Sequence, residues 1–240
     1  MGLRIAFDLD WVLADMGSAL TREERRLVGI HEISLQPWPG AKTAAEPDHS
    51  KRAPTNPVLL EMERHGLTAA QQKLLWGSVA QTANFWETLA EIEPGCVRTL
   101  AQLARKFRWE TIFLTKRPRT AGDTAQVQTQ RWLEHHGFER PSVFVVNGSR
   151  GKIAEALDLD IVVDDLPVNC IDVLTDSRAK AILVWRGPST TIPDGATRLG
   201  IRVVRSMGEC LDVLTAIEGR AQRRTWRARV KSALRPAALS

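Results

Sequence analysis

The chain has 240 residues, of which 43% are hydrophobic and 25% are charged, and its formal net charge is +5. These values are ordinary for a globular protein, and the length suits one domain with an insertion or two small domains. No apolar run approaches the roughly 18 residues of a membrane span, and Arg4 and Asp8 interrupt the apolar start, which argues against a signal peptide. The three cysteines, Cys96, Cys170 and Cys210, are far apart and odd in number. They argue against a disulfide framework or a zinc site and indicate a reducing, cytoplasmic compartment.

The first predicted element is a buried strand at residues 5–9, followed by polar residues. It carries Asp8 and Asp10 at its carboxyl end. Residues two apart in a strand point to the same side, so both carboxylates could enter one small volume. Two carboxylates this close repel each other, and a fold tolerates them mainly where a cation or a substrate proton uses them. The alternative is a strand end that carries two solvated aspartates.

Residues 16–93 show helical periodicity and no clear strand, which predicts a helical cap inserted after the first strand. Within it we expect helices at 17–30, 58–65, 68–76 and 79–92, and a proline-rich loop at 36–57. Thr68 and Gln71 have the spacing of a capping box at the start of one of these helices.

From residue 94 helices and strands alternate regularly. We expect strands at 111–115, 142–146, 161–164, 181–185 and 201–204, with helices at 96–106, 121–136, 152–157, from 167 onward and at 208–217. This alternation predicts an α/β fold with a mostly parallel, Rossmann-like sheet covered by helices on both faces. The catalytic core would comprise residues 1–15 and 94–217.

Polar residues follow several of these strands. Thr115 ends the second predicted strand, and Asp164 and Asp165 end the strand at 161–164. Lys152 opens the short helix that precedes the latter strand. Because the carboxyl ends of parallel strands share one edge, we expect these side chains to converge with Asp8 on one crevice. Singly, Thr115 could merely end a strand, the aspartates could cap a helix, and Lys152 could be a solvated helix residue.

The ordered set of DxDxV, an insertion, a strand-ending threonine, a lysine and a strand-ending DD resembles the haloacid dehalogenase superfamily of phosphohydrolases. The resemblance extends to about residue 217. Residues 85–95 and the sequence LTKRP at 114–118 further resemble the nucleotidase branch, which includes the deoxyribonucleotidases.

The resemblance implies catalytic roles at matching positions. Asp8 would attack phosphorus and form an aspartyl phosphate, and Asp10 would protonate the leaving alcohol and then deprotonate water. Thr115 and Lys152 would bind the phosphoryl oxygens. Lys116 is a further candidate for binding substrate.

The resemblance also implies a magnesium ion. Asp8, the Asp10 backbone carbonyl and Asp164 would hold it, and Asp165 would lie near its water shell. Hard oxygen ligands without a nearby histidine or cysteine favour the same ion.

Aromatic residues near the implied site allow two interpretations. Phe85 and Trp86 could stack on a nucleotide base, or they could belong to the hydrophobic core. Trp11 stands where many members of the superfamily have glycine, and we expect its bulk to face the cap.

The C-terminal segment, residues 218–240, contains seven basic residues and one acidic residue. Since the whole chain has 33 basic and 28 acidic residues, residues 1–217 carry 26 and 27, a net charge of −1. Helical spacing puts Trp226, Val230 and Leu234 on one face of the segment, and basic residues on another. Such a helix can bind nucleic acid, an anionic surface or an acidic partner, or it can pack on the body through Trp226.

Taken together, the patterns predict a magnesium-dependent phosphomonoester hydrolase, most simply one that acts on nucleoside monophosphates, including deoxyribonucleotides. Another small phosphomonoester or a phosphorylated nucleic-acid end is the alternative within this class. A non-catalytic module that binds through its basic tail is the alternative outside it.

Overall fold

The computed structural model describes residues 2–33, 67–188, 192 and 194–233. Its centre is a six-stranded sheet in the order β3-β2-β1-β4-β5-β6, in which every pair of neighbours is parallel. The strands are β1 (Arg4–Asp8), β2 (Glu110–Thr115), β3 (Ser142–Val145), β4 (Ile161–Asp164), β5 (Lys180–Val184) and β6 (Arg202–Val204). The predicted α/β fold with a parallel sheet is confirmed.

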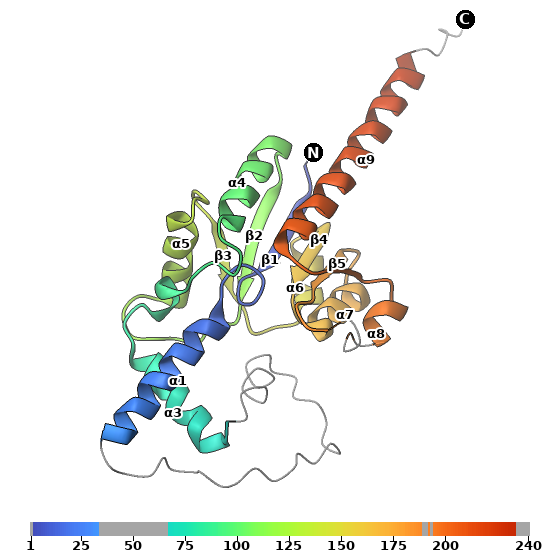
Figure 1. Cartoon of the computed structure of the whole chain (residues 1–240). Coiled ribbons are helices and arrows are strands. Elements are labelled where there is room, and N and C mark those ends of the chain that lie inside the picture. Colours follow the sequence, from blue (N-terminus) through green and yellow to red (C-terminus); the bar gives the residue numbers. More distant parts are fainter. Residues whose placement is uncertain (1, 34–66, 189–191, 193, 234–240) are drawn as a thin grey trace, which may run out of the picture.

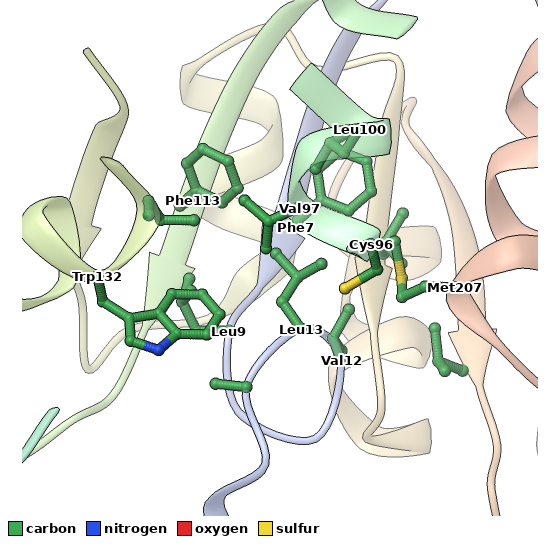
Figure 2. Close-up of a cluster of buried hydrophobic side chains, with 14 of the residues drawn as sticks. Phe7, Leu9, Val12, Leu13, Cys96, Val97, Leu100, Phe113, Trp132 and Met207 are labelled. Carbon is green, nitrogen blue, oxygen red and sulfur yellow. The ribbon is translucent and has the colours of Figure 1, made fainter. Parts of the chain in front are cut away.

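Helices cover both faces of this sheet, because successive strand residues alternate between two cores. Ile5 and Phe7 of β1 enter one core, and Ala6 enters the other. The first core is covered by α4 (Cys96–Phe107), α5 (Ala125–His135) and α9 (Met207–Ala233). The second is covered by α6 (Arg150–Ala156), α7 (Pro167–Asp176) and the short α8 (Asp194–Arg198), which was not predicted. Figure 2 shows side chains from β1, the loop after it, α4 and α5 meeting in the first core.

The segment between β1 and α4 contains α1 (Met16–Ile33), α3 (Ala69–Gln81) and a 3-10 helix, η1 (Phe85–Thr88). Figure 1 shows α1 and α3 side by side, near the carboxyl ends of the strands. Arg26 of α1 joins the two helices, since its guanidinium donates to Glu23 and to Ser78 of α3. The predicted capping box of Thr68 and Gln71 is confirmed at the start of α3.

The predicted helix at 79–92 is wrong. The chain leaves α3 after Gln81, and Asn84 takes a left-handed backbone conformation with φ of 52°. This conformation is incompatible with a continuous α-helix, so only the single turn η1 follows. The predicted loop at 36–57 and helix at 58–65 lie outside the described residues.

The predicted division after residue 217 falls inside α9, which continues without a break to Ala233. Glu218 anchors this part of the helix, because its buried carboxylate accepts a hydrogen bond of 3.2 Å from the indole of Trp109. Figure 1 shows the last turns of α9 extending past the body of the protein. Among the helices that the structure describes, none combines the length and the hydropathy needed to cross a membrane.

Candidate active site

A cavity lies where β1, β2 and β4 end. Asp8, Thr115 and Asp164 are the last residues of these three strands. Because β1 lies between β2 and β4 in the sheet, their carboxyl ends are adjacent. Asp8, Asp10 and Asp165 line the cavity. The structure therefore brings together the carboxylates that the sequence placed at separate strand ends.

Arg150 is the cation closest to the expected nucleophile. Its Nη2 donates to Asp8 Oδ1 at 2.5 Å, and its Nε lies 3.4 Å from Asp164 Oδ2. The side chain is 1% exposed, and its Nη1 has no hydrogen-bond partner in the described part of the chain. Arg150 also lines the cavity, so this unpartnered donor belongs to a residue of the cavity wall.

Lys152, the expected phosphate-binding cation, lies elsewhere. Its side chain is exposed, and it does not line the cavity. The reason is the start of α6, where Ser149 acts as the N-cap and Arg150 is the first helical residue. Positions two apart on a helix lie on nearly opposite faces, so an inward Arg150 turns Lys152 to solvent. Arg150, and not Lys152, is therefore the basic residue that α6 places at the cavity.

Asp10 is held by a second buried arginine, Arg117. Arg117 Nε lies 3.0 Å and 3.1 Å from the two carboxylate oxygens of Asp10, and its Nη2 lies 2.8 Å from Oδ1. Thr115 Oγ1 is 3.4 Å from Asp10 Oδ2 and accepts a hydrogen bond of 3.1 Å from the backbone N–H of Arg117. Thr115 thus organises the loop after β2, and it is fully buried.

The paired aspartates after β4 have different surroundings. Asp164 accepts from Asn169 Nδ2 at 3.0 Å to each oxygen and from the backbone N–H of Leu166 at 2.9 Å. It is fully buried and does not line the cavity. Asp165 lines the cavity and has no hydrogen bond to another described residue. Asp164 is thus an anchor for Arg150, whereas the half-buried Asp165 lines the cavity. The sequence suggests Asp164 as the direct metal ligand and Asp165 as its neighbour.

The protonation of this cluster reflects its excess of negative charge. Burial and the charge of Asp164 raise the pKa of Asp8 from 3.8 to about 8, although Arg150 opposes the shift. Burial and the charges of Asp164 and Asp8 raise the pKa of Asp165 well above its ordinary value. If all four carboxylates were ionised, the two buried guanidinium groups would leave two negative charges unbalanced, and this excess opposes the ionisation of Asp8 and Asp165.

Few of the side chains near the cavity are free to bind a magnesium ion. Among the described residues, no three side chains of His, Cys, Asp or Glu are grouped so as to hold a metal. Asp164 is saturated by its own hydrogen bonds, and Arg117 binds only the carboxylate of Asp10. This leaves Asp8, the Asp10 backbone carbonyl and Asp165 as possible ligands. Magnesium usually binds through one or two carboxylates and keeps several waters. Asp8 and Asp165 fit this pattern, and a divalent cation would balance the two uncompensated charges.

Tryptophan side chains form much of the remaining wall. Trp11 and Trp76 are half-buried and line the cavity. Trp11 has a φ of 67°, in the region that favours glycine, and its ring lies against Gly17 of α1, where an added Cβ would be 2.0 Å from Trp11 Cη2. The bulk of Trp11 is thus accommodated on the cap side, as expected.

The other predicted substrate contacts divide between core and cavity. Phe85 is buried in the core and does not line the cavity. Trp86 touches the cavity but is 0% exposed, and its indole N–H donates to the carbonyl oxygen of Pro118. Their burial leaves Trp11 and Trp76 as the more accessible aromatic surfaces. Lys116 is half-buried and lines the cavity.

Sequence reasoning missed four contributors: Arg117, Arg150, Asn169 and Trp76. One of them, Arg150, carried a signal. Ser149 precedes Arg150 as a good N-cap residue, and Arg150 lies four positions before the buried Ala154, so helical periodicity could have selected it. Arg117 follows Thr115 in the sequence, but its inward direction depends on a loop that no periodicity predicts.

The chain was compared with known proteins. No protein-family model matches it, and no curated protein matches its sequence. A proposed β-phosphoglucomutase from Thermotoga maritima is 17% identical, with a TM-score of 0.55 over 90% of this chain and 99% of that chain. A HAD-family hydrolase from Deinococcus radiodurans R1, solved with bound phosphate and sodium, is 16% identical, with a TM-score of 0.52 over 90% and 96%. A predicted phosphatase from Clostridium acetobutylicum is 14% identical, with a TM-score of 0.51 over 90% and 98%. The fold of this chain is therefore the fold of the haloacid dehalogenase-like hydrolases.

Proposed function

We propose that this protein is a magnesium-dependent phosphomonoester hydrolase that acts through a phosphorylated Asp8. The observation that carries the proposal is the environment of Asp8. One carboxylate oxygen is held by Arg150, the other accepts no hydrogen bond from a described residue, and the side chain lines a cavity beside the unpartnered Arg150 Nη1. This arrangement orients a nucleophile and supplies a donor for the group that it would attack.

The proposed reaction has two steps. Asp8 attacks phosphorus, so a bond forms between its carboxylate oxygen and phosphorus while the bond from phosphorus to the alcohol oxygen breaks. Asp10 gives its proton to that leaving oxygen. Water then attacks the phosphorylated Asp8, Asp10 accepts the water proton, and inorganic phosphate leaves with the Asp8 carboxylate restored.

Cationic groups would stabilise the charge on the phosphoryl oxygens during both steps. Arg150 and Lys116 are the candidates that line the cavity. Thr115 contributes by fixing the loop that carries Lys116. A magnesium ion held by Asp8 and Asp165 would add positive charge near the same oxygens and lower the repulsion between the substrate and the carboxylates.

We further propose nucleoside monophosphates, including deoxyribonucleotides, as the substrates. Support comes from the indole rings of Trp11 and Trp76, which line the same cavity as the carboxylates and give a planar base a surface on which to stack. Other small phosphomonoesters would use the same phosphoryl site without this contact. The variant Trp76→Ala separates these cases, because it should raise KM for a nucleotide and leave KM for glycerol phosphate nearly unchanged.

The test is phosphate release from nucleoside monophosphates and sugar phosphates, with and without magnesium. The wild-type chain should release phosphate only with the metal, and Asp8→Asn should abolish release. Asp212→Asn, which changes an exposed carboxylate on α9, is the matched control and should keep full activity. Folded wild-type protein that releases no phosphate from any of these compounds would contradict the proposal.

A further inference from the structure

Arg117 is a buried arginine that contacts Asp10, the expected general acid. Its side chain is 0% exposed, and it forms the two-point ion pair with Asp10 described above. A third donor, Nη1, gives a hydrogen bond of 3.0 Å to Thr129 Oγ1 on α5. The guanidinium is thus fixed at both ends, by Asp10 on the loop after β1 and by Thr129 on a helix.

Two tryptophans pack against the same guanidinium. Arg117 Cζ lies 5.1 Å from the ring centroid of Trp86 and 5.9 Å from that of Trp132. Each indole is itself fixed, because Trp86 donates to Pro118 O at 2.9 Å and Trp132 donates to Leu89 O at 2.7 Å. Cation–π contacts in a desolvated site hold an arginine in one position, so the guanidinium has no freedom to follow a moving carboxylate.

The partner of this rigid group is more accessible. The Asp10 side chain is 14% exposed and lines the cavity. It lies on the loop after β1, where an isolated bridge to Ala14 holds its backbone but not its side chain. Without Arg117, the remaining side-chain contact of Asp10 would be the weak one to Thr115 at 3.4 Å. The orientation of the Asp10 carboxylate is therefore determined by Arg117.

We propose that Arg117 is a positioning residue that aims Asp10 at the leaving oxygen of the substrate. This assignment rests on the proposed function. Arg117 itself does not touch the reacting atoms in this account. It acts by holding Asp10 within reach of the bond between phosphorus and oxygen that breaks, and proton transfer from a well-placed acid contributes roughly 10²–10⁴-fold to such a step.

A positioning role and a general structural role predict different patterns across substrates. An alkyl phosphate has a strongly basic leaving oxygen that needs the proton of Asp10. The leaving group of p-nitrophenyl phosphate is weakly basic and departs without it. A misplaced Asp10 should therefore slow hydrolysis of the alkyl phosphate much more than hydrolysis of p-nitrophenyl phosphate. A general loss of structure should slow both reactions by the same factor.

The experiment measures kcat/KM for glycerol phosphate and for p-nitrophenyl phosphate in four chains: wild type, Arg117→Met, Arg117→Lys and Asp10→Asn. Because kcat/KM covers only the steps up to release of the alcohol, it isolates the step in which Asp10 is an acid. For Arg117→Met we expect a loss of about 10²-fold on the alkyl substrate and less than about tenfold on the aryl substrate. Asp10→Asn should show the same pattern, and Arg117→Lys should recover part of the alkyl activity.

Thr129→Val is a second variant for the case in which Arg117→Met does not fold. It keeps the volume of the side chain and removes only the hydrogen bond to Arg117 Nη1, so it should change the ratio of the two kcat/KM values in the same direction by a smaller factor. Equal losses on both substrates in every folded Arg117 and Thr129 variant would overturn the assignment and leave the proposed function intact. A wild-type chain that hydrolyses neither substrate, and releases no phosphate from any nucleoside monophosphate, would overturn both.

Discussion

Replacement of Arg150 tests which basic residue of α6 serves the site. In Arg150→Met, the ion pairs to Asp8 and Asp164 are lost while both carboxylates stay buried. Removal of one partner from a buried ion pair typically costs about 3–5 kcal/mol. Because the raised pKa of Asp8 lets that group become neutral, we expect the lower end of this range, about 3 kcal/mol in the metal-free protein. Phosphate release should fall to background.

Lys152→Met is the matched control, since it removes a positive charge two residues away on the same helix. Lys152 is exposed and has no part in the cavity, and such surface substitutions usually change stability by less than about 0.5 kcal/mol. The assay is urea unfolding of both metal-free variants, together with phosphate release at saturating magnesium. Greater loss of activity in Lys152→Met than in Arg150→Met would refute the assignment of Arg150 and restore the one made from the sequence.

Three further predictions concern neighbouring parts of the site. The pKa of Asp8 rises from 3.8 to about 8 on folding, so between these pH values the folded chain binds more protons than the unfolded chain. The metal-free protein should therefore lose stability as the pH rises toward about 8. A melting temperature that rises with pH over this range, or one that falls as steeply in Asp8→Asn as in the wild type, would contradict this prediction. Gly17→Ala should raise KM, because the new Cβ would lie 2.0 Å from the ring of Trp11. For the same reason it should not give the stabilisation of about 0.8–1.0 kcal/mol that a helix normally gains when alanine replaces glycine. A stabilised chain with unchanged KM would count against this prediction. Burial would raise the pKa of Glu93, but hydrogen bonds from the first backbone N–H groups of α9 and from Arg186 lower it below 4.5. Glu93→Gln should therefore lower the free energy of unfolding at neutral pH by about 1 kcal/mol. The difference between the two chains should shrink below about pH 4, where Glu93 becomes protonated.

The strand ends could be located from the sequence because each depends on a local pattern. Apolar runs that stop at Asp8, Thr115 and Asp164 mark the carboxyl ends of β1, β2 and β4. Parallel pairing then requires these ends to lie at one edge of the sheet. No knowledge of side-chain direction is needed for this step.

The sequence could not predict which of two neighbouring polar residues lines the cavity, because this depends on the direction of their side chains. The start of α6 at Arg150 instead of at Lys152 turns one cation inward and the other to solvent. Asp164 and Asp165 are adjacent and of the same type, and only the contacts of Asn169 and Leu166 show which one is saturated. Such contacts join residues from different turns of the chain, so neither periodicity nor spacing encodes them.

The aromatic residues illustrate the same limit. Phe85 and Trp86 have the composition of a base-stacking platform, yet η1 buries both in the core. Trp76 has no distinguishing sequence pattern, and the packing of α3 against α1 brings it to the cavity. Tertiary packing determines whether an aromatic ring is exposed, so the exposure of these rings could not be predicted from the sequence alone.

The most direct test of the account is to identify the phosphorylated residue. The wild-type chain would be mixed with a substrate and magnesium, quenched in acid during turnover, digested and analysed by mass spectrometry, with Asp8→Asn treated in parallel. The account predicts one added phosphoryl group, on the peptide that contains Asp8, and none in the variant. Turnover without a phosphorylated Asp8, or with the phosphoryl group on another residue, would contradict the assignment of the nucleophile and the mechanism built on it.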